Sequence, residues 1–177
     1  MARVKLIQPE ERPDQSALIE RIVKGRRGTF INVYKTLLHS PDIASVWLDL
    51  VNAVRWKTDL DGRLREIVIV RVGYLNKCAY VVKQHVPVIS TPEGLPQEEA
   101  DTLADWRGSK FFSKRERAAL AYTDAVTRDI DVPDPVFAAL RDHFDERQIV
   151  ELTVLIGSYI MHNRVFGALG VDLEPSS

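Results

Sequence analysis

Residues 149–166 read IVELTVLIGSYIMHNRVF, and the pattern of this stretch indicates the fold class. Apolar residues cover nearly the whole circumference of the helix that we expect from about Glu146 to Leu169. In a soluble protein, a helix of this kind is buried in the core or in a subunit interface. Gly170 follows it, and glycine is the residue type that most often ends a helix. The stretch therefore predicts a long, buried final helix.

The rest of the chain also carries helical patterns. Apolar residues recur at i, i+3, i+4 and i+7 in several segments, and few stretches read as strands. The apolar run within residues 63–72 also suits a strand, but its flanks favour a buried helix. Ser40 before Pro41, and the capping box of Ser113 and Glu116, are typical of helix starts. We therefore predict an all-α fold. Further helices are expected over about 15–24, 41–56, 63–72, 77–85, 97–106, 113–128 and 133–143, and one more is expected to begin near residue 32.

The length of 177 residues suits one folded unit with one core. We predict a single domain over residues 1–177, of which residues 1–14 form an extended lead-in. Residues 86–96 contain Pro87, Pro92 and Pro96. This segment is predicted to be a loop long enough to act as a lid or as an interface arm.

Charge and hydropathy exclude several classes of partner. The 24 lysines and arginines nearly cancel the 25 aspartates and glutamates, so no overall field attracts nucleic acid or an anionic membrane. The N-terminal residues lack the apolar core of a signal peptide, and no apolar run reaches the length of a membrane span. We therefore expect a cytoplasmic protein that binds neither nucleic acid nor membranes.

Cys78 is the only cysteine, which excludes a disulfide within the chain. With Asn76 as the expected helix cap, Cys78 falls in a first turn, where the helix dipole and Lys77 stabilise a thiolate. The alternative is that Cys78 is a small buried apolar residue. His85 lies two turns later on the same face. It acts as a general acid or base, or it is a helix-ending histidine that forms a hydrogen bond with a terminal carbonyl.

Two further groups of polar residues lie in apolar helices. Glu66 is either buried and paired, with Arg63 or Arg71 as partner, or it belongs to an exposed stripe. In the last helix, a second candidate site follows the spacing i, i+4, i+7 and i+11, although the same stripe also suits a polar seam at an oligomer interface. The residues of this stripe are Glu151, Leu155, Ser158 and His162.

No histidine, cysteine and carboxylate spacing in the chain matches a metal-binding pattern, and no phosphate-binding glycine loop is present. We therefore predict no metal and no cofactor.

The stretch REIVIVRVGYLNKCAYVVKQH, residues 65–85, resembles the signature of the carboxymuconolactone decarboxylase and alkylhydroperoxidase D-like superfamily. The glutamate, first cysteine and histidine of that signature fall on Glu66, Cys78 and His85, whereas Val81 occupies the place of the second cysteine. Three further blocks resemble the family as well: LLHSPDIASVWLDL, FSKRERAALAYTDAVTRD and VELTVLIGSYIMHNRVFGALGVDLE.

The resemblance implies a helical bundle of the alkylhydroperoxidase D type that assembles into a homo-oligomer, a trimer or a hexamer. Peroxidase-type members use the two cysteines as a redox dithiol, and Val81 counts against that activity here. Members without the cysteine pair act on small carboxylated lactones or dienoates from the breakdown of aromatic rings. Those members commonly carry a tyrosine and a histidine in the motif, which Tyr80 and His85 match.

The leading hypothesis is a cofactor-free lyase or isomerase that acts on a small-molecule substrate. In it, His85 is the general acid or base, Glu66 orients it, and Tyr80 donates a hydrogen bond to the substrate. Cys78 lines the pocket or serves as a secondary acid. Two alternatives stay open, namely a thiol enzyme that forms a sulfenic acid on Cys78 and a non-catalytic oligomeric protein. The residues expected to bind the substrate carboxylate are Arg55, Arg71, Arg164 and His162.

Overall fold

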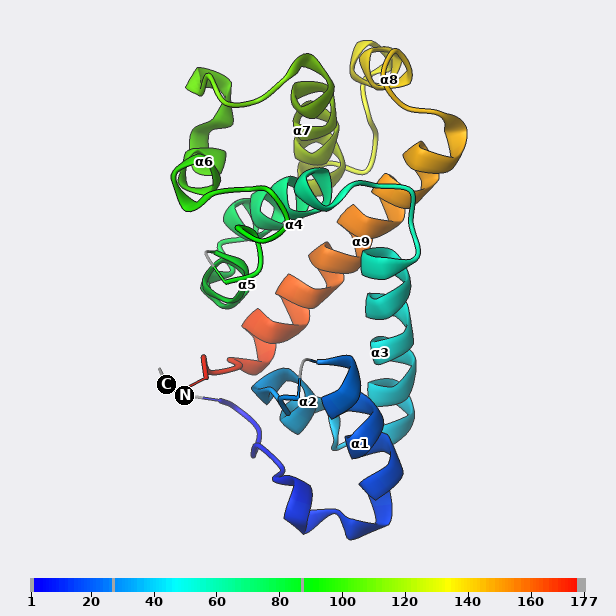
Figure 1. Ribbon diagram of the computed structural model, residues 1–177, viewed down its shortest axis with the longest axis vertical. Helices are drawn as coiled ribbons and strands as arrows, with labels where there is room; N and C mark the ends of the chain where they lie inside the picture. The colour runs from blue at the N-terminus through cyan, green and yellow to red at the C-terminus, as the bar shows by residue number, and fades with distance from the viewer. Residues whose placement is uncertain (1, 27, 87, 175–177) are drawn as a thin grey trace. The chain divides into compact units, whose positions relative to one another are not determined.

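The computed structural model describes residues 2–26, 28–86 and 88–174, and helices are the only regular secondary structure in these ranges (Figure 1). The prediction of an all-α fold is confirmed. The α-helices are α1 (Ser16–Gly25), α2 (Asn32–Leu37), α3 (Pro41–Trp56), α4 (Gly62–Leu75), α5 (Ala79–His85), α6 (Gln97–Asp101), α7 (Lys114–Arg128), α8 (Asp134–Arg141) and α9 (Glu146–Leu169). The 3-10 helices are η1 (Pro9–Glu11), η2 (Pro13–Gln15) and η3 (Thr102–Gly108). No described helix is both long and apolar enough to cross a membrane.

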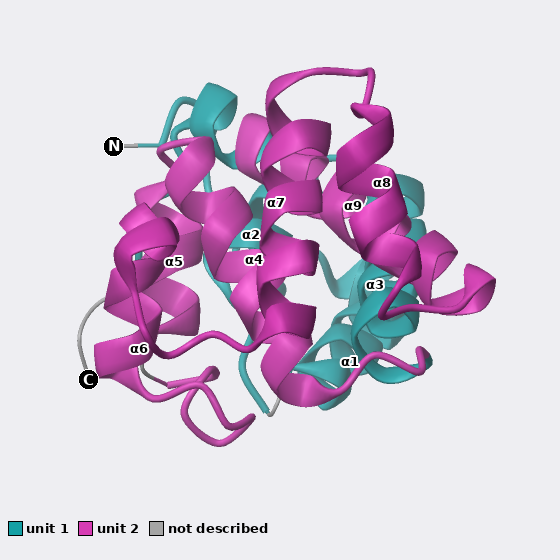
Figure 2. Ribbon diagram, turned by 90° about the horizontal axis from the view of Figure 1, so that it is seen from above, with its two compact units in different colours: residues 1–57, 165–177 teal, residues 58–164 magenta. Residues whose placement is uncertain are grey.

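The chain divides into two compact units, which Figure 2 shows in different colours. Unit 1 comprises residues 1–57 and 165–177, and unit 2 comprises residues 58–164. The prediction of one domain over residues 1–177 stays a prediction. Because Glu66, Cys78, Tyr80 and His85 all belong to unit 2, that unit holds the candidate site.

In unit 1, helices α1 and α2 both pack against α3. Ile22, Leu38 and Leu48 are buried there, and they form part of the core of this unit. The lead-in over residues 1–14 is partly extended as predicted, but it also contains η1 and η2. Its backbone is held by the N–H of Ile7, which donates to the carbonyl of Lys35.

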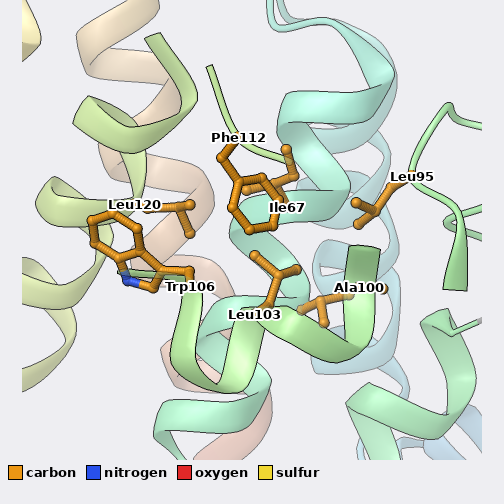
Figure 3. Close-up of a cluster of buried hydrophobic side chains, with 8 residues drawn as sticks. Ile67, Leu95, Ala100, Leu103, Trp106, Phe112 and Leu120 are labelled. Carbon is orange, nitrogen blue, oxygen red and sulfur yellow. The ribbon is translucent and has the colours of Figure 1, made fainter. Parts of the chain in front are cut away.

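In unit 2, helix α4 packs against α5, η3 and α7. Figure 3 shows a buried cluster of apolar side chains, to which α4, η3 and α7 contribute together with α6 and two loop residues. Burial of a side chain of this size contributes about 1.5–3 kcal/mol to folding. The cluster therefore fixes α4, the helix that carries Glu66. Its members are Ile67, Val70, Leu95, Ala100, Leu103, Trp106, Phe112 and Leu120.

Several helix starts and ends are confirmed. The Ser113 hydroxyl accepts from the backbone N–H of Glu116, and the Glu116 carboxylate accepts from the backbone N–H of Ser113, which completes the capping box of α7. Pro41 is the first residue of α3. Helix α9 has the expected bounds, and Gly170 beyond it adopts a positive φ of 59°.

The expected end of a helix at Gly73 is wrong, because α4 continues through it to Leu75. A Cβ atom at this position would lie 3.1 Å from Cγ2 of Val82 and 3.4 Å from Cγ1 of Val81. Gly73 therefore lets α5 pack closely on α4, rather than breaking the helix.

Residues 88–96 form a series of turns that follows α5; Pro87 lies outside the described residues. The backbone N–H groups of Ile89 and Ser90 both donate to the carbonyl of His85, each at 2.9 Å. Glu93 forms an ion pair with Arg65 at 2.9 Å, and Leu95 is fully buried in the cluster of Figure 3. These contacts hold the segment in place and do not support its action as a lid.

Candidate active site

Glu66 and His85 meet inside unit 2. Glu66 lies in the middle of α4 and is fully buried, and His85 is the last residue of α5. Nδ1 of His85 lies 2.6 Å from Oε2 of Glu66, which is a short, buried hydrogen bond. The sequence prediction that Glu66 is buried and paired is therefore confirmed, but the partner is His85 rather than Arg63 or Arg71.

The hydrogen bond determines which histidine nitrogen can exchange a proton. An ionised carboxylate can only accept, so Nδ1 of His85 donates to Glu66 whenever Glu66 is charged. Nε2 is then the nitrogen left to act as acid or base. A carboxylate that orients an imidazole in this way is an arrangement that general acid–base catalysis uses.

Two aromatic side chains of α9 extend this pair. The ring of Tyr159 lies 5.7 Å from the His85 ring in an edge-on arrangement, and 4.9 Å from the ring of His162. Sequence analysis singled out His162 but missed Tyr159. The available signal was its position three residues before His162, which puts both side chains on one side of the helix. We call Glu66, His85, Tyr159 and His162 the acid–base cluster.

The turn between α4 and α5 positions Cys78. The N–H of Cys78 donates to the carbonyl of Gly73, and the N–H of Lys77 donates to that of Tyr74. With Lys77 at a φ of 52°, these bonds form a Schellman motif that ends α4. Cys78 is therefore the N-cap of α5, and Asn76 is the C-cap of α4. The prediction that Asn76 caps a helix containing Cys78 is wrong.

The environment of Cys78 does not favour a thiolate. Burial raises the pKa of the Cys78 thiol, and the backbone N–H groups of Val81 and Tyr80 only partly oppose this effect. The sequence prediction of a stabilised thiolate is therefore corrected. Cys78 does line a surface hollow of about 370 Å³ between α4 and α5. Its other lining residues are Gly73, Tyr74, Lys77, Ala79, Val82 and Lys83.

Tyr80 and Val81 are both buried in α5. Val81 fills its place in the motif by packing against Gly73. Neither residue lines the hollow at Cys78. The role of Tyr80 as a donor to substrate stays a prediction.

Arg71 has a structural role. Its Nε donates to Asp124 at 2.6 Å, and its Nη1 donates to the carbonyls of Leu103 and Ala104. Burial opposes the charge of Asp124, but hydrogen bonds from Arg71 and Arg107 outweigh it and lower the pKa of Asp124. The structure therefore does not support the expected contact of Arg71 with a substrate.

The other two candidate arginines differ from each other. Arg164 is exposed near the end of α9 and belongs to unit 2. Arg55 is buried in unit 1, where its guanidinium carbon lies 4.7 Å from the centre of the Trp56 ring. The contacts of both residues with a substrate stay predictions.

The polar stripe of α9 serves several purposes. The Glu151 carboxylate accepts from the backbone N–H of Asp59 at 2.8 Å and from Arg147 at 3.0 Å. The Ser158 hydroxyl donates to the carbonyl of Val154 in its own helix. His162 is the member of the stripe that joins the acid–base cluster, through the contact of its ring with that of Tyr159. Across residues 2–26, 28–86 and 88–174, no three metal-ligating side chains converge.

An all-helical fold with a buried glutamate–histidine pair defines the class of this protein, and sequence comparison identifies the family. The profile of the carboxymuconolactone decarboxylase family matches residues 41–125, which include both members of the pair. The chain is 30% identical over 129 residues to the uncharacterized protein YnjA of Escherichia coli, covering 72% of this chain and 68% of YnjA. It is 26% identical over 133 residues to the uncharacterized protein YdfG of Bacillus subtilis, covering 74% of this chain and 89% of YdfG.

The chain belongs to the carboxymuconolactone decarboxylase family, and solved structures agree with this assignment. A protein of unknown function from Agrobacterium tumefaciens, described as a candidate AhpD antioxidant defence protein, shares 30% identity and a TM-score of 0.74, over 80% of this chain and 97% of that one. A peroxidase-related protein from Ralstonia eutropha reaches a TM-score of 0.84 at 24% identity, over 98% of this chain and 92% of that one. The debrominase Bmp8 bound to 2,3,4-tribromopyrrole reaches a TM-score of 0.81 at 18% identity, over 98% of this chain and 94% of that one. The last two likenesses establish the AhpD-like fold.

Proposed function

We propose that this protein is a cofactor-free acid–base enzyme, a decarboxylase or isomerase of a small carboxylated lactone or dienoate. The observation that supports the proposal is the 2.6 Å hydrogen bond between His85 and the fully buried Glu66. A buried carboxylate that holds an imidazole by Nδ1 leaves Nε2 as a directed proton donor or acceptor. Membership of the carboxymuconolactone decarboxylase family supports the same class of reaction.

In a decarboxylation, the bond between the substrate carbon and its carboxylate breaks, and the electron pair is delocalised as an enolate. Protonated His85 then gives its Nε2 proton to that carbon, carbon dioxide leaves, and solvent returns the proton to His85. Glu66 stabilises the imidazolium before the transfer. In an isomerisation, His85 removes a proton at one carbon and returns it at another. Arg164 and His162 of unit 2 are the proposed partners of the substrate carboxylate, and Tyr80 is the proposed donor to the enolate.

The test is a screen of ring-cleavage lactones and dienoates for carbon dioxide release or a change in ultraviolet absorbance. His85→Ala is expected to lower kcat at least about 100-fold, because a positioned general acid or base contributes roughly 10²–10⁴. Glu66→Gln is expected to lower kcat by a smaller factor. The matched control is His39→Ala, because His39 is exposed and its Nε2 lies 2.9 Å from the carbonyl of Lys5 in unit 1. Turnover that survives His85→Ala would contradict the proposal.

A second candidate is a thiol enzyme, which the hollow at Cys78 favours. In that reaction the Cys78 thiolate attacks a peroxide oxygen, the O–O bond breaks, and an alcohol or water leaves. An external dithiol then reduces the sulfenic acid and is itself oxidised to a disulfide. The raised pKa of Cys78 makes this the weaker candidate. Peroxide consumption that is unchanged in Cys78→Ser would eliminate it.

A further inference from the structure

Asn163 is a buried amide in α9 that the acid–base mechanism above does not use. Its side chain is 3% exposed, and neither Nδ2 nor Oδ1 has a hydrogen-bond partner in the part of the chain that the structure describes. Burying an amide without partners opposes folding, so native proteins rarely retain one without a reason. An apolar side chain of the same size would be favoured at this position if packing were the only requirement.

Two hydroxyl side chains of α9 are satisfied within the helix. Thr153 donates to the carbonyl of Ile149, and Ser158 donates to the carbonyl of Val154, both at 2.7 Å. These hydroxyls follow the usual pattern for polar side chains inside a helix. Asn163 does not follow it, and this difference separates it from Thr153 and Ser158.

The position of Asn163 connects it with the acid–base cluster. It lies one helical turn after Tyr159, so the two side chains leave α9 on the same side. The Tyr159 ring lies 5.7 Å from the ring of His85. The unpartnered amide therefore lies on the same side of α9 as Tyr159, whose ring contacts that of His85.

We propose that Asn163 binds the ligand of the acid–base cluster and selects one that carries a carbonyl beside an N–H or O–H donor. Nδ2 of the amide donates to the carbonyl, and Oδ1 accepts from the adjacent donor. A carboxylate has no donor and would leave Oδ1 without a partner, whereas a lactam or the enol form of a ring ketone satisfies both atoms. This inference rests on the proposed function for the location of the ligand. It adds the requirement that the lactone or dienoate proposed there carry an N–H or O–H donor beside a carbonyl.

The stability of Asn163→Leu is the first part of the test, because leucine has a similar volume and no polar atoms. If the amide is retained for a ligand, the variant is expected to unfold at a temperature higher by roughly 2–8 °C. A lower unfolding temperature would show that the amide is satisfied in the folded protein, and it would overturn the proposal. The matched control is Ser158→Ala, which removes a hydroxyl that bonds within its own helix.

The second part measures binding by protein-observed NMR titration with 2-pyrrolidinone, a lactam, and with γ-butyrolactone, which has the same ring without the N–H. The lactam is expected to shift the Asn163 side-chain amide signals, identified as those missing from Asn163→Leu. The lactone is expected to bind at least about fivefold more weakly, the equivalent of one hydrogen bond. Ser158→Ala is expected to bind the lactam as the wild type does.

Three outcomes would each overturn the proposal. They are equal binding of the two compounds, lactam binding that survives Asn163→Leu, and the absence of lactam binding to the wild type. The titration requires no turnover, so its outcome is independent of whether His85 catalyses a reaction. Binding that persists in His85→Ala without any turnover in the substrate screen would refute the proposed function and leave the role of Asn163 intact.

Discussion

Asp124 joins three elements of unit 2 through buried charge. Arg71 of α4, Trp106 of η3 and Arg107 all donate to its carboxylate, and its side chain is almost fully buried. Removing one partner of a buried ion pair leaves the other charge uncompensated, at a cost of about 3–5 kcal/mol. The pair therefore stabilises the packing of α4, on which the position of Glu66 depends.

Asp124→Asn is expected to lower the free energy of unfolding by about 3 kcal/mol at pH 7. The pKa of Asp124 is lower in the folded chain than the value near 3.9 of an unfolded aspartate. Its contribution is therefore fully present above about pH 4 and is lost as the pH falls through the folded pKa. Urea unfolding at several pH values should show a constant difference between wild type and variant from pH 5 to 7, and a smaller one below pH 4.

The control for this measurement is Arg128→Gln, because Arg128 is exposed and lies 3.7 Å from the same carboxylate. An exposed ion pair contributes less than about 1 kcal/mol, so this variant should unfold almost as the wild type does. An Asp124→Asn variant as stable as Arg128→Gln would refute the structural role of Asp124.

Cys78 should react slowly with alkylating agents at neutral pH. Because burial raises its pKa, the thiolate fraction at pH 7 is smaller than that of a free thiol. The rate of modification by iodoacetamide should reach half its maximum at a higher pH than the rate for glutathione measured alongside. The chain has one cysteine, so incorporated label reports this site alone. A half-maximum below that of glutathione would restore the thiolate predicted from the sequence and favour the thiol enzyme.

Some contacts between residues could be predicted from the sequence, and others could not. The family resemblance supplied the hypothesis that Glu66 orients His85, whereas the residues around Glu66 suggested Arg63 or Arg71 as its partner. The ion pair of Arg71 with Asp124 joins residues 53 positions apart and has no local signal. Tyr159 was missed for the same reason, since its approach to His85 depends on how α9 packs against α5.

The turn between α4 and α5 contains the one described residue other than glycine with a positive φ, Lys77 at 52°. A side chain in the left-handed region costs about 1–2 kcal/mol, and glycine avoids this cost. Lys77→Gly is therefore expected to raise the free energy of unfolding by up to about 1 kcal/mol, after the greater chain entropy of glycine is subtracted. Urea unfolding measures the change.

Lys83→Gly provides a matched control for this turn. Lys83 is also exposed, but it lies inside α5, where glycine costs about 1 kcal/mol relative to alanine. The two substitutions should therefore change stability in opposite directions. Destabilisation by both would show that Lys77 contributes contacts that outweigh its backbone strain.

Helices were predicted well where capping residues or long apolar patterns mark them, as for α3, α7 and α9. The boundary between α4 and α5 was not, because two features with no sequence signal determine it. Gly73, a residue that usually interrupts a helix, is tolerated within α4 since α5 packs on it. Lys77 adopts a left-handed backbone conformation, which is expected of glycine rather than of lysine. Cys78 was consequently assigned to the interior of a helix that it caps.

Helix α9 presents an apolar stripe at its exposed side within unit 2. Val150 is 62% exposed and Val154 is 46% exposed, and Gly157 and Met161 continue the stripe at alternating intervals of three and four residues. This is the spacing of helices that pair in coiled coils. A Cβ atom added at Gly157 would meet no atom within 4 Å, so another helix has room to approach closely. We propose that this stripe is the contact between copies of the chain.

Size-exclusion chromatography with light scattering at micromolar concentration is therefore expected to give the mass of a trimer or a hexamer rather than the 20.1 kDa of one chain. Val154→Glu would bury an unpaired carboxylate at each contact, which costs several kcal/mol, so the variant should dissociate. Ile130→Glu is the matched control, because Ile130 is fully exposed between α7 and α8. A monomeric wild type, or a Val154→Glu variant that keeps the wild-type mass, would exclude this stripe as the contact.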